Sequence, residues 1–313
     1  MSISYLITLY NKEAFIGPVM DAVLAEHAET GGEVIVYDDV STDRSVKIAQ
    51  QSIAAHPGQA SAVQIVRGTV NGGLGFATNE LVKRAAFPYT HLVDADDILV
   101  PGSNAAMLRL MKENNLGHIF GNMADAGVND HGLESQRYEQ CFILHNALRV
   151  ILRHTVAGPS PSIYVTEELR KCFPLPPWVR YTQDFPIGMR MANRGVRIGY
   201  VKETVAIRPR YTGDNLSTSL AAMFAEMTRD VVHDADSLKL ADLRYVTRRH
   251  ARRAAKYLRR RGQNPLNFRD RLDLWRGQNL SLIAPRQACV EWLGRTAALL
   301  ERERYVVVTE PTA

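Results

Sequence analysis

The sequence predicts an α/β fold in which a mostly parallel sheet, flanked by helices, is followed by a helical C-terminal region. Three observations predict it. Strand-like and helix-like patterns alternate five times over residues 3–123, which is typical of a parallel sheet covered by helices on both faces. Polar residues collect directly after the predicted strands. Beyond residue 217 the hydrophobic pattern becomes mostly helical.

The predicted strands are short apolar runs rich in β-branched residues, of the kind that a parallel sheet buries on both faces. The first run, ISYLITL, ends at a turn formed by Asn11 and Lys12. The helices show apolar residues at spacings of three and four, and Gly31 and Gly32 end the first helix. The strands are predicted over residues 3–9, 33–37, 62–66, 91–93 and 119–123, and the helices over 18–30, 45–55, 76–86 and 101–114.

The rest of the chain divides into an irregular and a helical part. Prolines interrupt residues 125–180. A helix within 181–194 and a strand at 196–201 follow. Further helices are predicted over 220–232, 235–261, 268–275 and 286–300. We therefore expect an α/β domain over residues 1–217 and a basic helical region over residues 218–313.

The composition is that of a soluble globular protein, with 46% hydrophobic and 23% charged residues among 313. The three cysteines form no C-x-x-C pair, which argues against a disulfide framework and a cysteine zinc site and favours a reducing, cytoplasmic setting. No apolar stretch approaches the ~18 residues that a membrane span needs. The apolar N-terminal run has no basic segment before it, so we interpret it as a strand and not as a signal peptide.

The positive charge is concentrated in the C-terminal region. Residues 1–217 contain 20 Lys and Arg against 22 Asp and Glu, whereas residues 218–313 contain 18 against 11. Nine of the basic residues, and no acidic one, lie within residues 244–261. This segment is interpreted either as a solvated helix or as a helix that faces an anionic membrane surface. Nucleic acid is a weaker candidate, because the segment lacks the aromatic interleaving of a base-stacking surface.

Acidic residues follow the predicted fourth strand as Asp94, Asp96 and Asp97. Crowded carboxylates repel one another unless a cation or hydrogen-bond donors lie between them. Mg²⁺ and Mn²⁺ accept carboxylate oxygens together with phosphate oxygens. The sequence therefore predicts either a divalent metal site or an acidic turn that caps the following helix.

Two further polar segments follow predicted strands. Asp38 and Asp39 exceed what is needed to cap the next helix, since Ser41 could do so. The glycine-rich segment 71–75 precedes a helix, where backbone amides could approach a phosphate or a sugar. Its spacing matches neither the dinucleotide fingerprint nor the P-loop. Because the carboxyl ends of parallel strands share one edge of a sheet, we expect these segments to converge on one ligand site.

The sequence resembles glycosyltransferase family 2, the inverting enzymes of GT-A fold. The resemblance covers roughly residues 1–217 and rests on motifs in the family's order. These motifs are ISYLITLYN at 3–11, VIVYDDVSTD at 34–43, the glycine segment at 71–79, LVDADDILVP at 92–101, YTQDF at 181–185 and the strand segment at 194–201.

The resemblance implies a metal-dependent transfer of a sugar from a nucleoside diphosphate donor, with a UDP-sugar favoured, to a hydroxyl of a saccharide or lipid-linked acceptor. It implies Asp184 as the catalytic base and Asp96, with Asp94, as ligands of Mn²⁺ or Mg²⁺. The residues implied for donor binding are Thr8, Tyr10, Glu13, Asp39, Gly73, Asp94 and Arg210. Without the resemblance, Asp184 is interpreted as a carboxylate at a helix N-terminus. Trp178 could stack on an acceptor sugar or simply pack.

The sequence departs from the family at Thr78, where an Arg is frequent, at Gln183, where the family has Glu, and at Thr212, where it has His. These changes affect donor identity more than reaction class. A catalytically silent module that binds carbohydrate or a partner is the alternative function. A sugar-nucleotide pyrophosphorylase is disfavoured, because no Gly-rich basic loop follows the first strand. The expected location is cytoplasmic, peripheral at the inner membrane face if the basic helix binds lipid.

Overall fold

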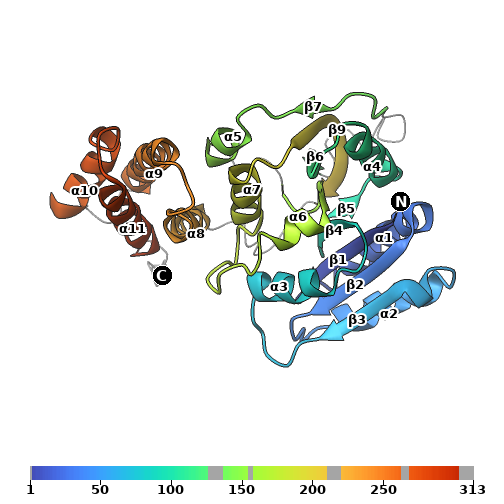
Figure 1. The fold of residues 1–313 in the computed structure, drawn as a ribbon. Coiled ribbons are helices and arrows are strands. Elements are labelled where there is room, and N and C mark those ends of the chain that lie inside the picture. The colour runs from blue at the N-terminus through green and yellow to red at the C-terminus, as the bar shows by residue number, and fades with distance from the viewer. Residues whose placement is uncertain (1, 126–136, 154–157, 210–219, 262–267, 303–313) are drawn as a thin grey trace. The chain divides into compact units, whose positions relative to one another are not determined.

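The computed structural model describes all residues except 1, 126–136, 154–157, 210–219, 262–267 and 303–313. The chain forms two compact units (Figure 1). An α/β unit comprises residues 1–151, 155–179 and 187–212. A helical unit comprises residues 152–154, 180–186 and 213–313. The sequence places a single boundary near residue 217, whereas the structure also groups two short earlier segments with the C-terminal helices.

The first half of the sheet is parallel. Strand β1 lies between β2 and β4, and β3 pairs with the outer side of β2, all in parallel register. The elements of this half are β1 Ile3–Leu9, α1 Ile16–Thr30, β2 Gly32–Asp38, α2 Ser45–Ala55, the 3-10 turn Ala60–Ala62, β3 Val63–Arg67, α3 Leu74–Arg84, β4 Tyr89–Asp94 and α4 Ser103–Glu113. All four predicted strands and all four predicted helices of this half are present.

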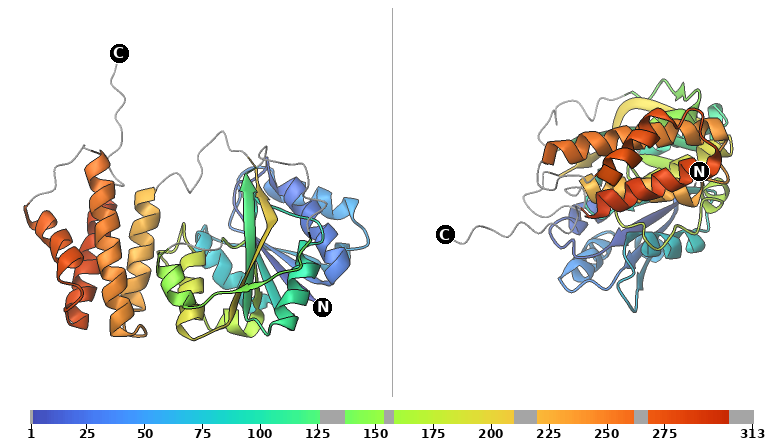
Figure 2. Two further views of the ribbon diagram at one scale, coloured as in Figure 1. Left: turned by 90° about the horizontal axis from the view of Figure 1, so that it is seen from above. Right: turned by 90° about the vertical axis from the view of Figure 1, so that its left-hand side faces the viewer.

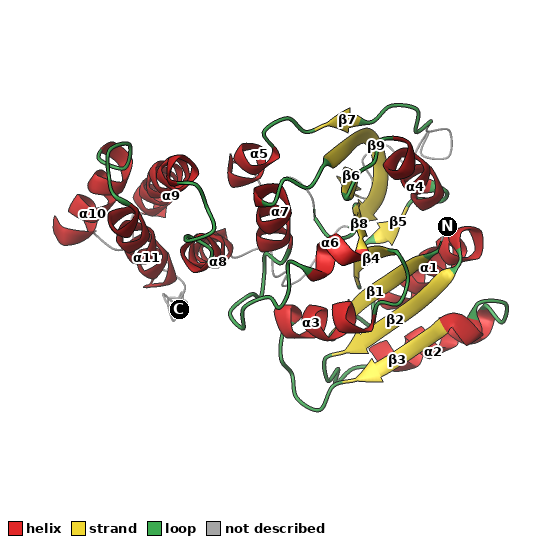
Figure 3. Ribbon diagram, viewed as in Figure 1, coloured by secondary structure: helices red, strands yellow, loops and turns green. Residues whose placement is uncertain are grey.

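The second half of the sheet is mixed (Figure 3). The strand order is β3-β2-β1-β4-β8-β6-β9-β5, and β7 pairs with β9. Strand β8 runs antiparallel to both β4 and β6, whereas β6 and β9 are parallel. The elements are β5 Ile98–Leu99, β6 His118–Asp125, β7 Phe142–Ile143, α5 Ala147–Arg153, β8 Ser162–Val165, α6 Thr166–Arg170, α7 Asp184–Asn193 and β9 Ile198–Arg208. The predicted α/β class is confirmed, and the antiparallel strands in this half are what the sequence pattern did not reveal.

Helices lie on both faces of the sheet (Figure 2), and a hydrophobic cluster packs against each face. Side chains alternate along each strand, so neighbouring residues enter different clusters. In β1, Tyr5 and Ile7 pack with α1 and α4, whereas Leu6 packs with α3 and α7. In β2, Val36 belongs to the cluster that contains Tyr5 and Ile7, and Ile35 belongs to the cluster that contains Leu6. Burial on both faces explains why these strands are continuous apolar runs and could be located from the sequence.

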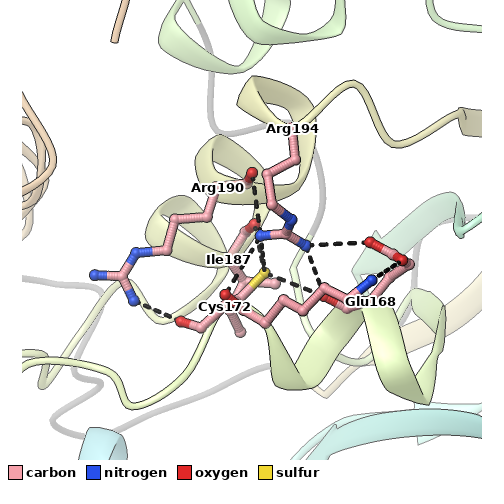
Figure 4. A network of polar contacts seen from close by, with 6 residues as sticks. Glu168, Cys172, Ile187, Arg190 and Arg194 are labelled. Carbon is pink, nitrogen blue, oxygen red and sulfur yellow. Dashed lines mark hydrogen bonds and ion pairs between the residues drawn. The ribbon is translucent and has the colours of Figure 1, made fainter. Parts of the chain in front are cut away.

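A polar network fastens α6 to α7 within the α/β unit (Figure 4). Arg194 donates to the carbonyl oxygen of Glu168 at 2.8 Å, and Arg190 donates to the carbonyl oxygen of Cys172 at 2.5 Å. The Cys172 thiol lies 3.6 Å from the carbonyl oxygen of Ile187. Burial raises the pKa of Cys172, so this thiol is protonated at neutral pH and has a packing role.

The helical unit contains α8 Leu220–His233, α9 Leu240–Arg261, α10 Phe268–Asn279 and α11 Arg286–Arg302. Its core includes Val231, Leu243, Leu274 and Leu293, all nearly inaccessible to solvent. Within the described residues, no helix combines the length and the apolar character that crossing a membrane requires.

Candidate active site

Strand β1 brings two acidic segments to one edge of the sheet. In the parallel register, Leu9 of β1 pairs with Asp38 of β2, and Thr8 pairs with Asp94 of β4. The segments that follow β2 and β4 therefore begin on either side of the carboxyl end of β1. Open α/β sheets bind ligands beyond this edge, as the sequence predicts for this chain.

Asp39 organises the glycine-rich loop before α3. It is 3% exposed, and its two carboxylate oxygens accept hydrogen bonds from the amides of Gly72 at 2.9 Å and Gly73 at 2.7 Å. Gly73 has φ +80°, a conformation that other residues rarely adopt. The loop and the end of β2 thus form one connected structure, and any ligand group that bound Asp39 would have to join or replace these amides.

Asp38 is a structural carboxylate. It is fully buried, one of its oxygens accepts the amide of Ser41 at 3.0 Å, and the other accepts Arg67 at 3.1 Å. The two acidic residues at the end of β2 therefore have different structural roles. Asp38 closes the turn toward α2, and Asp39 faces the glycine loop.

The turn after β4 presents Asp96. The amide of Asp94 donates to the Ser160 hydroxyl at 3.0 Å, and the amide of Asp97 donates to the carbonyl oxygen of Asp94 at 3.1 Å. Lys12, from the loop after β1, lies with its ammonium nitrogen 2.5 Å from a carboxylate oxygen of Asp96. This ion pair joins the loops that follow β1 and β4.

Asp97 is the most buried carboxylate of this turn. Burial raises the pKa of Asp97 to about 6, and the negative charge of Asp96 acts in the same direction. A hydrogen bond to Ser160 and the positive charges of Arg208 and Lys12 oppose the shift. The Arg208 guanidinium lies 4.0 Å from Asp97. Burial and Asp96 therefore favour the neutral form of Asp97, whereas Arg208 and Lys12 favour its charged form.

The chemistry of this turn fits a divalent cation. Asp94 and Asp96 are hard oxygen donors, and both keep part of their surface accessible. In the described part of the chain, no group of three or more His, Cys, Asp or Glu residues forms a metal cage. A cation that bridges one or two carboxylates to substrate phosphates needs no such cage. It would compete with Lys12 for Asp96.

The other residues predicted after β1 lie at the same edge but differ in their partners. Thr8 is half-buried at the end of β1, and the Tyr10 side chain is 46% exposed. The Glu13 carboxylate accepts the amide of Arg44 at 3.0 Å and its guanidinium at 3.2 Å. These bonds lower the pKa of Glu13. In the structure described here Glu13 holds the start of α2.

In the helical unit, the segment 180–186 carries Asp184, the first residue of α7. Burial raises the pKa of Asp184 to about 7, and the charge of Glu226 acts in the same direction. The amides of Asp184 and Phe185 oppose the shift. A carboxylate in these surroundings takes up and releases a proton near neutral pH. This is the property that a general base requires.

Two predicted residues need separate comment. Trp178 is half-buried and packs against the cluster that contains Leu81 and Leu175, so a packing role accounts for at least part of its surface. Arg210 lies outside the described residues, as does Thr212.

Sequence reasoning missed Lys12, Ser160 and Glu226. Lys12 carried a signal, because it lies in the turn after the first predicted strand, at the same edge as Asp96. Ser160 lies in a proline-rich stretch with no periodic pattern. Glu226 occupies a helix whose other inward positions are mostly apolar, and an acidic residue there needs a buried partner.

Comparison with known proteins identifies the family. The model of "Glycosyl transferase family 2" matches residues 4–163, about half of the chain. The chain belongs to this family. Poly(ribitol-phosphate) beta-glucosyltransferase of Bacillus spizizenii is 31% identical to this family 2 chain over 144 residues, which cover 45% of this chain and 22% of the relative. The matched residues thus span less than a quarter of that protein's length.

Two solved structures share the fold of this family 2 chain. S. aureus TarS 1-349 in complex with UDP-GlcNAc has a TM-score of 0.64 at 17% identity, covering 99% of this chain and 93% of TarS 1-349. The mannosyltransferase PcManGT from Pyrobaculum calidifontis, in complex with GDP-Man and Mn²⁺, has a TM-score of 0.60 at 14% identity, covering 97% and 87%. These likenesses confirm the predicted GT-A-like architecture followed by a helical region.

Proposed function

We propose that this chain is an inverting, metal-dependent glycosyltransferase that moves a sugar from a nucleoside diphosphate donor, preferably a UDP-sugar, to a hydroxyl of a saccharide or lipid-linked acceptor. Membership of family 2 gives the reaction class. The observation that carries the proposal is the convergence of Asp39, Asp94 and Asp96 at the carboxyl edge around β1. This arrangement offers a carboxylate to a nucleoside and two carboxylates to the diphosphate end of a donor.

The donor end of the site combines rigid backbone with charge. Asp39 and Gly73 are already connected by a hydrogen bond, so the nucleoside side of the site is ordered before the donor binds. Asp94 and Asp96 would hold Mn²⁺ or Mg²⁺, which when bound neutralises charge on the departing diphosphate. Lys12, now paired with Asp96, is placed to contact a phosphate if the cation takes its position. Asp96 would thus exchange the Lys12 ammonium group for the cation as its counter-ion.

Asp184 supplies the base in this proposal. As the acceptor oxygen bonds to the anomeric carbon, the hydroxyl proton passes to the Asp184 carboxylate. The bond from the anomeric carbon to the diphosphate oxygen breaks, and the diphosphate leaves with the electron pair. Attack on the face opposite the leaving group inverts the configuration. A pKa of about 7 suits the task, because proton transfer is most effective when the pKa of the base lies near the working pH.

For the acceptor, the proposal names one aromatic residue and a basic surface. Trp178 keeps part of its surface accessible, and an aromatic ring there could stack on a sugar ring. Exposed basic residues of α9, Arg252 and Lys256 among them, could hold the protein at an anionic membrane surface where a lipid-linked acceptor resides.

Ligand-dependent stabilisation followed by turnover tests the proposal. UDP, GDP, dTDP and CMP would each be added with Mn²⁺ or EDTA, because a ligand that binds only the folded protein raises its melting temperature. We expect UDP with Mn²⁺ to give the largest rise. Release of nucleotide from UDP-GlcNAc, UDP-glucose and GDP-mannose would then be measured. Stabilisation without turnover of any donor would instead support a silent binding module. Turnover indifferent to EDTA would remove the metal from the proposal.

A further inference from the structure

The Glu226 side chain makes an unusual set of contacts inside the helical unit. It projects from α8 and is 5% exposed. One carboxylate oxygen accepts the amide of Arg180 at 2.8 Å. The other accepts the amide of Tyr181 at 3.0 Å, and the amide and hydroxyl of Thr182 at 2.8 Å each. A single carboxylate therefore satisfies three successive backbone amides and one side chain.

The segment that Glu226 holds leads directly into Asp184. The amide of Phe185 donates to the carbonyl oxygen of Thr182 at 3.1 Å, so Thr182 and Asp184 belong to one turn. Amides that precede a helix have no partner within that helix. A charged acceptor forms stronger hydrogen bonds to such amides than a neutral acceptor does. Since Glu226 binds them from a distant part of the chain, it fixes the backbone from which the Asp184 side chain extends.

We propose that Glu226 is a positioning residue for glycosyl transfer: by binding the amides of residues 180–182, it holds the Asp184 carboxylate in the geometry that accepts the acceptor proton. This inference rests on the proposed function, in which Asp184 is the base. It assigns to the helical unit a part in the reaction, because the residue that orders the base belongs to α8.

The electrostatic surroundings agree with this role. The charge of Glu226 adds to burial in raising the pKa of Asp184. His250 of α9 lies against Phe185, with ring centroids 6.5 Å apart. Burial lowers the pKa of His250 to about 3, so this ring is neutral. Arg253 faces Phe224, with its guanidinium carbon 4.9 Å from the ring centroid. Glu226 is thus the negative charge that acts on Asp184 from α8.

The test compares Glu226→Gln with Asp273→Asn. Glutamine keeps the size of Glu226 and one acceptor oxygen, but it removes the charge. It also places an NH₂ donor where a backbone N–H needs an acceptor. Asp273 is a matched control in the same unit. It is a buried carboxylate, 2.7 Å from Arg295, and the partners described for it lie on α10 and α11. A general loss of stability would appear in both variants.

Three readouts separate positioning from stability. With the UDP-sugar turned over fastest by the natural protein, Glu226→Gln should lower kcat about 10- to 100-fold, as expected for a displaced catalytic group. The KM for the donor should stay within about twofold. On the acid side of the pH profile, the pH at which kcat/KM falls to half its maximum should become lower, because Glu226 no longer raises the pKa of Asp184. Asp273→Asn should leave kcat and this pH unchanged. An unchanged kcat together with an unchanged half-maximal pH in Glu226→Gln would overturn the inference.

Hydrogen exchange supplies a measurement that does not depend on a donor. The amides of Arg180, Tyr181 and Thr182 should exchange faster in Glu226→Gln than in Asp273→Asn, because they lose a charged acceptor and one of its two oxygens. Equal exchange in the two variants would overturn the inference. If Glu226→Gln does not fold, Thr182→Val removes only the hydroxyl bond and should lower kcat about fivefold, in line with ~1 kcal/mol for one hydrogen bond. Unchanged kcat in Thr182→Val would then count against it.

Asp184→Asn distinguishes a failure of the proposed base from a failure of the proposed positioning role of Glu226. If this variant keeps full activity, the base assignment fails, and with it the proposed function of Asp184. If Asp184→Asn is inactive while Glu226→Gln behaves as the natural protein, only the positioning role fails. If both residues act together, the double variant should be little worse than Asp184→Asn alone, because Glu226 has no base left to position.

Discussion

At the scale of single residues, we expect Asp184 to couple activity and stability to pH in opposite directions. Its pKa is raised to about 7 by burial, so the proposed base is protonated below this pH. We expect kcat/KM to rise about tenfold per pH unit up to about pH 7 and then to level off. Because the folded-state pKa exceeds the unfolded value, the stability that Asp184 contributes is complete below the unfolded pKa of 3.8 and is lost as pH rises through about 7.

Asp184→Asn separates these effects. The variant should lose ~10²–10⁴ in turnover and still be stabilised by UDP with Mn²⁺. It should also unfold at a higher temperature than the natural protein at pH 8, because residue 184 then carries no charge that folding must desolvate. Thermal unfolding at pH 5 and pH 8, with the nucleotide-release assay, measures both. An unchanged pH profile of the natural enzyme across pH 6–8 would contradict the assignment of the base.

Asp96 is expected to control how strongly the cation contributes to donor binding. Asp96→Ala removes a proposed metal ligand and also the ion pair with Lys12, whose ammonium nitrogen lies 2.5 Å from the Asp96 carboxylate. The stabilisation by UDP that depends on Mn²⁺ should weaken by about tenfold in apparent affinity. UDP binding in EDTA should change little. Glu113→Ala, which removes an exposed carboxylate paired with Arg109, serves as the control. Equal metal dependence in the two variants would exclude Asp96 as a ligand.

At the scale of elements, the glycine loop is fastened at both ends. Asp39 binds its start, and the amide of Gly75 in α3 donates to the carbonyl oxygen of Val179 at 3.0 Å. A Cβ on Gly75 would lie 2.6 Å from that oxygen. Gly75→Ala should therefore lower the free energy of unfolding by about 1–3 kcal/mol. Gly58→Ala, where a Cβ meets no atom within 4 Å, should change it by less than about 0.5 kcal/mol. Urea unfolding measures both.

The elements that sequence could locate are those whose own residues determine them. Strands β1, β2 and β4 are buried on both faces, so each is a continuous apolar run. Strand β5 has only two residues, and β8 follows a proline-rich stretch and gains its place by pairing with β4 and β6. Such pairing is a property of the tertiary fold. For the same reason the convergence of Asp39 and Asp94 was predictable from strand order, whereas the hydrogen bond from the Asp94 amide to the Ser160 hydroxyl was not.

Helix α9 shows how far tertiary contacts alter a sequence-based interpretation. Its apolar stripe is thin in sequence. In the structure small residues such as Ala251 and Ala254 complete a buried face. Basic residues also take structural roles. Arg244 donates to the carbonyl oxygen of Ala284 at 2.8 Å, and Arg249 donates to that of Arg153 at 2.6 Å. The number of basic residues in α9 therefore overstates the charge that is available to an external surface.

At the scale of the whole molecule, charge is unevenly divided. Residues 1–217 carry a net charge of −2 and residues 218–313 a net charge of +7, from 20 basic against 22 acidic and 18 against 11. An anionic surface would therefore attract the C-terminal region and not the α/β domain. Arg252 and Lys256 are exposed on α9, and they are the residues through which we expect this attraction to act.

Vesicle sedimentation tests the predicted attraction. The protein should bind vesicles that contain phosphatidylserine more tightly than vesicles of phosphatidylcholine alone, and added salt should weaken the binding. Arg252→Gln with Lys256→Gln should weaken it about 30-fold, since each basic residue near such a surface contributes ~1 kcal/mol. Lys47→Gln with Lys112→Gln removes two exposed charges from α2 and α4 and should have little effect. Equal binding to both kinds of vesicle would show that the basic helix is a solvated surface. The charge of α9 would then no longer favour a lipid-linked acceptor.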